Sequence, residues 1–119
     1  MKPNVEQAIE EIRQYFPHSN VETKDDGSGG AYVFVDSVDF GPSYTEETRL
    51  TWIGFHLAYN YPLSDIYPHH VRPDLKKINS QPLPEGMHRD RRFDSFGRSS
   101  VMISRRMHVA TSSCGPTIR

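Results

Sequence analysis

The sequence predicts a single α+β domain in which one N-terminal helix packs on an antiparallel meander of strands. Three observations predict this class: an amphipathic repeat near the N-terminus, alternating apolar and polar residues in later segments, and short glycine-containing turns between those segments. At 119 residues the chain has room for one domain with one modest core. Residues 110–119 are mostly small and include Gly115 and Pro116, so we expect a flexible tail there.

Residues 4–16 carry the helical pattern. The apolar side chains that recur at helical spacing are Val5, Ala8, Ile9, Ile12 and Phe16. Acidic residues fill most of the opposite face. Asn4 can cap the first turn, and Pro17 should end the helix after Phe16. We therefore expect a surface helix with one apolar stripe.

Three segments after the helix have the pattern of strands. Residues 21–24 and 31–40 flank a turn at residues 25–30, where the glycines accept positive φ without a Cβ penalty. Residues 49–59 follow a second turn. Short turns between consecutive strands predict an antiparallel meander.

The alternation also predicts which side chains meet the helix. We expect one face to carry Tyr32, Phe34, Val38 and Phe40 from the second strand, and Ile53, Phe55 and Leu57 from the third. In this prediction the helix packs Ile9, Ile12 and Phe16 against Phe34, Ile53, Phe55 and Leu57.

Residues 61–85 are rich in proline and lack the strand pattern. The five prolines that remove backbone donors there are Pro62, Pro68, Pro73, Pro82 and Pro84. No long strand is expected in this part, because proline cannot donate to a strand ladder. Alternation resumes at residues 99–109, which we expect to form the last strand.

Charge is distributed unevenly along the chain although its net value is −1. Residues 1–60 carry four Lys/Arg against ten Asp/Glu, and residues 61–119 carry ten against five. The candidate binding residues are Arg89, Arg91, Arg92, Arg105 and Arg106, with Arg98 beside them. Such a cluster can bind an acidic protein, contact a nucleic-acid backbone or simply be solvated. We rank nucleic acid lowest, because the aromatic residues lie mainly on strands that must supply the core.

The composition favours a cytoplasmic protein with no membrane span. No apolar run approaches the roughly 18 to 20 residues that cross a bilayer, and no leader pattern is present. The single cysteine, Cys114, cannot form an internal disulfide, which fits a reducing compartment.

The histidines do not predict a metal site. The metal candidates are His69, His70, His88, His108 and Cys114, and their spacing lacks any pair of ligands typical of a tetrahedral zinc site. Adjacent histidines in an extended segment point to opposite sides. We therefore expect neither a metal nor another cofactor.

The order of elements carries a family resemblance. The third predicted strand runs into Tyr61-Pro62, Pro68 and Val71 follow, and Gly41-Pro42 ends the second strand. This pattern resembles the ubiquitin-conjugating (E2) superfamily. Met87-His88-Arg89 and Ser104-Arg105-Arg106 are similar to divergent bacterial E2-like proteins of ubiquitin-like conjugation operons, some of them linked to antiphage defence.

The resemblance implies a UBC-like fold and a component that carries or binds a ubiquitin-like protein, with an E1-like enzyme as a second partner. Aligned on Tyr61-Pro62, the family's carrier cysteine falls between His88 and Met102, where this chain has no cysteine and no His-Pro-Asn run. Thioester chemistry would then need Cys114, with His108 to orient or deprotonate the thiol. The alternative is a non-catalytic interaction module of the same fold, similar to UEV or RWD domains.

Overall fold

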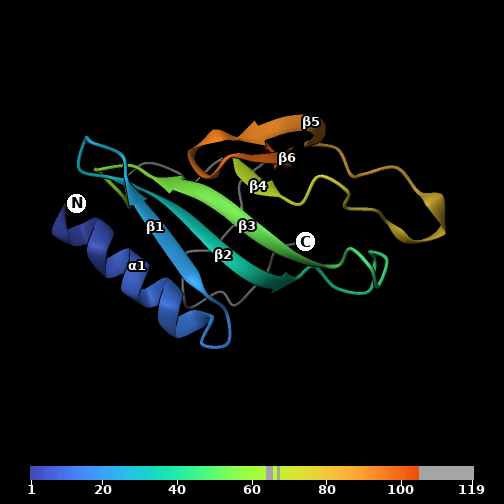
Figure 1. Cartoon of the computed structure of the whole chain (residues 1–119), viewed down its shortest axis with the longest axis horizontal. Coiled ribbons are helices and arrows are strands. Elements are labelled where there is room, and N and C mark those ends of the chain that lie inside the picture. Colours follow the sequence, from blue (N-terminus) through green and yellow to red (C-terminus); the bar gives the residue numbers. More distant parts are fainter. Residues whose placement is uncertain (64–65, 67, 105–119) are drawn as a thin grey trace.

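A computed structural model, which describes residues 1–63, 66 and 68–104, contains one helix beside a six-stranded antiparallel sheet (Figure 1). The elements are α1 (Pro3–Tyr15), β1 (Val21–Asp25), β2 (Ala31–Asp39), β3 (Leu50–Leu57), β4 (His69–Val71), β5 (Met87–Phe93) and β6 (Arg98–Ile103). The strand order is β1-β2-β3-β4-β6-β5. The α+β class and the antiparallel meander of β1 to β3 are therefore confirmed, and the tail predicted at residues 110–119 lies outside the described residues.

Helix α1 begins one residue earlier than predicted and ends near the predicted position. Pro3 occupies its first turn, where a missing N–H costs nothing, and Lys2 is the residue before the helix. The prediction that Asn4 caps the helix is wrong: the Asn4 amide instead donates to the carbonyls of Tyr59 and Tyr61, 3.0 and 2.5 Å away. The start of α1 is thus bound to the chain that follows β3.

The main core lies between α1 and one face of the sheet. It contains Val5, Ala8, Ile9 and Ile12 from the helix, with Val33, Val35, Ile53, Phe55 and Leu57 from β2 and β3. Phe16 packs against it at the end of the helix. The predicted roles of Ile53, Phe55 and Leu57 in the core are confirmed.

The prediction for Phe34 is wrong, because this ring lies on the opposite face of the sheet. Val33 pairs with Phe55 and Val35 with Ile53, which places the two valines on the core face. A register shift between Val35 and Val38 inserts one extra residue into β2 and inverts its alternation. Val38 therefore returns to the core face and does not share a face with Phe34.

The second face of the sheet is covered by aromatic rings from the hairpin of β5 and β6. Figure 1 shows this hairpin beside β4, on the side of β3 away from α1. The ring of Phe93 lies 5.0 Å from His70, 6.3 Å from Trp52 and 5.3 Å from Phe96, measured between ring centroids. The hairpin therefore curls over the sheet and builds a smaller aromatic cluster there.

Strand β5 was not predicted from the sequence. Its residues, Met87 to Phe93, lack the alternation of apolar and polar side chains that marks a half-buried strand, because four of them are exposed. Pairing with β6 forms this strand. Strand β4 has only three residues, in keeping with the expectation that no long strand forms in the proline-rich part.

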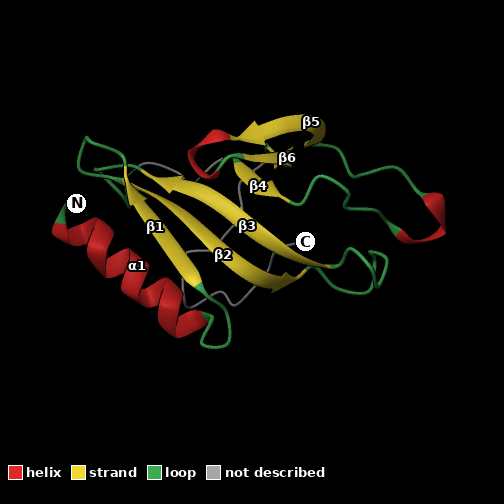
Figure 2. Cartoon of the chain, in the orientation of Figure 1, coloured by secondary structure: helices red, strands yellow, loops and turns green. Residues whose placement is uncertain are grey.

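Residues 72–86 form an extended loop between β4 and β5. Figure 2 shows its short helical turn, Ile78–Ser80, at the far end of the molecule from α1. No helix in the described part of the chain is long and apolar enough to cross a membrane.

Gly54 in β3 allows the hairpin to approach the sheet. A Cβ at this position would lie 2.6 Å from Cδ2 of the Phe93 ring, which is far inside normal contact distance. We predict that Gly54→Ala lowers the free energy of unfolding by about 1 to 3 kcal/mol, because the added methyl overpacks the aromatic cluster. Urea denaturation measures this change. In a Phe93→Ala background the cost should shrink, and an undiminished cost there would contradict the proposed contact.

Candidate binding surface

Strand β5 is the edge of the sheet. It ends the strand order, and no strand among the described residues pairs with its outer side. Its residues Arg89, Asp90, Arg91 and Arg92 are exposed. Asp90 has φ 61° at the register shift between His88 and Arg91, so a bulge interrupts the ladder with β6.

The three arginines of β5 have different surroundings. The guanidinium of Arg89 donates to the carbonyls of Pro73 and Leu75, at 3.3 and 2.9 Å. Arg92 makes an exposed ion pair with Asp94 at 2.9 Å. The side chain of Arg91 has no hydrogen bond or ion pair within the described residues. Arg89 therefore holds the loop, whereas the Arg91 side chain is exposed without such a contact.

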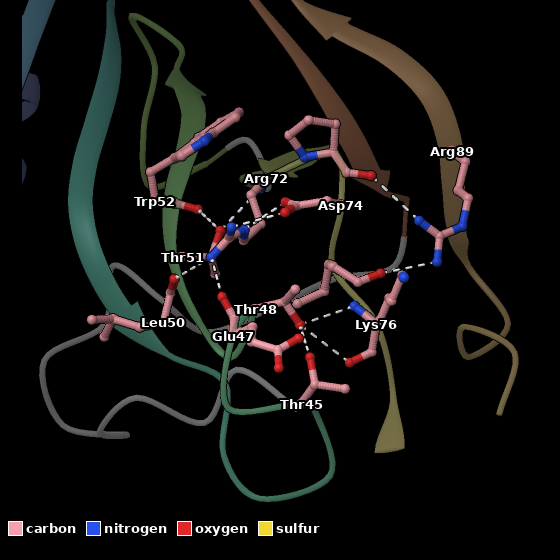
Figure 3. A network of polar contacts seen from close by, with 12 residues as sticks. Thr45, Glu47, Thr48, Leu50, Thr51, Trp52, Arg72, Asp74, Lys76 and Arg89 are labelled. Atoms are coloured by element: carbon pink, nitrogen blue, oxygen red, sulfur yellow. Dashed lines mark hydrogen bonds and ion pairs between the residues drawn. The ribbon is translucent and has the colours of Figure 1, made fainter. Parts of the chain in front are cut away.

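The loop of residues 72–86, to which Arg89 is hydrogen-bonded, also contacts the residues around the start of β3 (Figure 3). The Arg72 guanidinium donates to the carbonyls of Glu47 and Leu50, at 2.9 and 3.1 Å, and forms a two-bond ion pair with Asp74. The hydrogen bond from Arg72 holds the pKa of the Asp74 carboxyl below its usual range. These contacts fasten residues 72–74 to the turn that precedes β3.

Two threonines complete this network. The Thr51 hydroxyl accepts the backbone N–H of Arg72 at 2.9 Å, and Thr48 accepts that of Lys76 at 3.1 Å. Both threonines are buried, so these bonds satisfy polar groups that would otherwise lose water without replacement. Residues 72–76 thus bridge the β2–β3 loop and β5, and they fix where the arginine-bearing edge begins.

Strand β4 places its two histidines on opposite faces of the sheet. His69 is fully buried in the main core, with its ring 5.6 Å from that of Phe55. His70 lies on the aromatic face, where its Nδ1 is 2.8 Å from the Ser100 hydroxyl. Within the described residues, no group of three His, Cys, Asp or Glu side chains is arranged to hold a metal ion.

His69 is a buried polar group. Neither of its ring nitrogens has a hydrogen bond to another described residue, although the side chain is completely buried. Burial lowers the pKa of His69 from 6.5 to about 4, and the neighbouring His70 acts in the same direction. The imidazole is therefore neutral at physiological pH and behaves as part of the apolar core.

The region in which the resemblance expects a carrier cysteine is fully described. Ser100 lies within it, has no exposed surface and is paired with His70. This hydroxyl is sealed from solvent, so it does not present a nucleophile to another protein, whereas the neighbouring Ser99 is exposed.

Asp26 and His56 form a hydrogen-bonded pair beside the turn between β1 and β2. The Asp26 carboxylate accepts the N–H groups of Ser28 and Gly30 and lies 2.6 Å from Nε2 of His56. The hydrogen bond with His56 is the main cause that lowers the pKa of Asp26. His56 stacks on Tyr32, with ring centroids 4.6 Å apart. The sequence predicts the turn at residues 25–30 but not the contact between its Asp26 and His56.

The Tyr61-Pro62 motif lies where the chain leaves the sheet after β3. Tyr61 is half-buried against the core, and burial raises the pKa of its phenol. The peptide bond before Pro62 is cis, and the carbonyl of Tyr61 accepts the bond from Asn4. Both residues are structural in position, at the junction of α1 and the sheet.

Four predicted site residues lie outside the described residues: Cys114, His108, Arg105 and Arg106. Of the others, Arg91 and Arg92 lie together on the β5 edge and Arg89 is turned toward the loop. The aromatic cluster under β5 was missed. An available signal was the single small residue, Gly54, in an otherwise bulky strand. No protein-family model, curated protein or solved structure matches the chain.

His69 predicts an acid-sensitive stability. The folded-state pKa lies below 6.5, so between pH 6.5 and about 4 the unfolded chain binds more protons, and stability is lost as the pH falls through this window. We expect His69→Leu to raise the free energy of unfolding by about 1 to 3 kcal/mol at pH 7, because it removes unpartnered nitrogens. The gain should grow by up to about 3 kcal/mol toward pH 4.

Denaturant titrations at several pH values measure both effects. His18→Leu is the control for loss of a histidine, because His18 is exposed. A His69→Leu variant that is less stable than the wild type at pH 5 would contradict this account.

Proposed function

We propose that this chain is a binding component, rather than a thioester carrier, of a ubiquitin-like conjugation pathway, and that it docks an acidic surface through the arginine-bearing edge of β5. The observation that carries the docking part is the position of Arg91 and Arg92, exposed on an unpaired edge strand within the described residues. A partner that meets this edge contacts guanidinium groups and the backbone of β5.

Support for an E2-like architecture comes from the order of elements. An N-terminal helix precedes an antiparallel meander, and the third strand leads into Tyr61-Pro62, which is bound to the helix through Asn4. The ubiquitin-like partner and the E1-like partner rest on the resemblance alone. The β5–β6 hairpin supplies the binding edge in this proposal.

Support for a role without carrier chemistry comes from the region between His88 and Met102. The region has no thiol, and of its two serines in β6, Ser100 is buried and Ser99 is exposed. A thioester needs a thiolate that can attack and later leave. Cys114 is the one residue of the chain with that chemistry.

The docking surface is tested by reversing the charge of Arg91 and Arg92 together. We expect Arg91→Glu with Arg92→Glu to weaken binding of the ubiquitin-like partner by about tenfold at low salt and to flatten its salt dependence, because both charges lie on the strand edge that the partner contacts. The control is Lys76→Glu with Lys77→Glu, which changes the net charge equally on the neighbouring loop. Equal weakening by both pairs would contradict a specific edge, and surface plasmon resonance separates these results.

The absence of carrier chemistry is tested with Cys114. Incubation with ATP, an E1-like enzyme and a ubiquitin-like protein encoded beside this gene should give no adduct that thiol reductant cleaves, and Cys114→Ala should bind its partner as the wild type does. A reductant-sensitive adduct that Cys114→Ala abolishes, and that Cys114→Ser converts to a more stable ester, would show a carrier instead. If no such genes lie nearby, the pathway assignment loses its support.

A further inference from the structure

We infer that the partner of the β5 edge is an acidic, extended segment of another protein, which adds to the sheet as a strand beside β5. This inference rests on the proposed docking surface and specifies how the partner binds there. Strand addition uses backbone hydrogen bonds for affinity and side chains for selectivity. The described part of β5 offers both kinds of group.

The backbone of β5 offers outward groups for such pairing at Arg89, since the N–H of Met87 already donates to the carbonyl of Pro84 at 3.2 Å. The N–H of Ser104 donates to the carbonyl of Gly86 at 2.8 Å, and the next pairs along the ladder are Met87 with Ile103 and His88 with Met102. Bonded and non-bonded pairs alternate in an antiparallel ladder. The N–H and carbonyl of Arg89 therefore point away from β6, toward the open edge.

The side chains of β5 select the charge of an added strand. Arg92 is paired with Ser99 of β6 and Arg91 with Ser100, so consecutive arginines project to opposite faces of the sheet. A strand laid along this edge meets a guanidinium on either face. Acidic side chains next to these positions are favourable, and basic ones are repelled.

A second copy of this chain does not fit the edge. Two β5 strands placed side by side would set arginine against arginine, which disfavours pairing. The other sheet edge, β1, is a poor donor of an acidic strand, because Asp25 already pairs with the N-terminal ammonium at 3.1 Å and Arg13 donates to the carbonyl of Val21. The three arginines of β5 thus disfavour self-pairing and favour an acidic partner.

The test uses a synthetic capped heptapeptide of alternating glutamate and valine, with a lysine–valine peptide as the charge control. Nitrogen-edited NMR of the full chain should show shifts in β5 and slower amide exchange at Arg89 with the acidic peptide. A strand uses the N–H groups of alternate residues for one edge. We therefore expect a peptide N-methylated at all residues to lose binding. Of two further peptides, one methylated only at the glutamates and one only at the valines, we expect one to bind, because its free N–H groups face β5.

The results test strand addition separately from the proposed docking surface. If all methylated peptides bind equally and Arg91→Glu with Arg92→Glu still weakens them, docking is electrostatic and strand addition is overturned while the docking surface stands. If neither the peptide nor the ubiquitin-like partner responds to this charge reversal, the docking surface itself is overturned. Sedimentation that shows self-association abolished by the same substitutions would identify a second copy as the occupant and overturn the inference.

Discussion

The contact between Phe93 and Gly54 is the constraint on which the second half of the structure depends. A strand of bulky residues has one position without a side chain, and the ring of Phe93 occupies that space. The contact brings the β5–β6 hairpin over the sheet, where Phe34, Trp52 and Phe96 stack around it. Each face of the central strands is therefore covered, one by α1 and the other by the hairpin. Among the described strands, this arrangement leaves β5 at the edge of the sheet.

Strand β4, which joins the β1–β3 meander to the β5–β6 hairpin, is short and contains a destabilising buried histidine. Strand β4 has three residues and joins β3 to β6. His69 in this strand fills core volume with no hydrogen bond to its ring nitrogens from the described part of the chain, whereas His70 is held by Ser100 on the other face. The hydrogen bonds of Arg72 and Arg89 reinforce the same region from the adjoining loop. Several polar contacts thus compensate for a strand too short to be stable by itself.

The arginines of β5 show why a charge cluster in sequence is not yet a surface. A register shift between His88 and Arg91 adds one residue to β5, so Arg89 and Arg91 do not follow one regular alternation. Arg89 supports the loop, while the side chain of Arg91 has no hydrogen bond or ion pair within the described residues. Arg92 is partly neutralised by Asp94 at an exposed site, where such a pair contributes little stability. The proposed docking surface depends on the exposed backbone of β5 as much as on its charge.

The sequence alone determined the helix, the meander of β1 to β3 and the end of β3 near Tyr61-Pro62, because helical spacing, strand alternation and proline act over a few residues. It did not determine the face of Phe34, since a bulge in β2 inverts the alternation after Val35. It also missed β5, whose exposed residues form a strand only because β6 pairs with them. The tertiary structure decided which arginines are available and placed a histidine in the core. Both depend on partners distant in sequence, which no local pattern specifies.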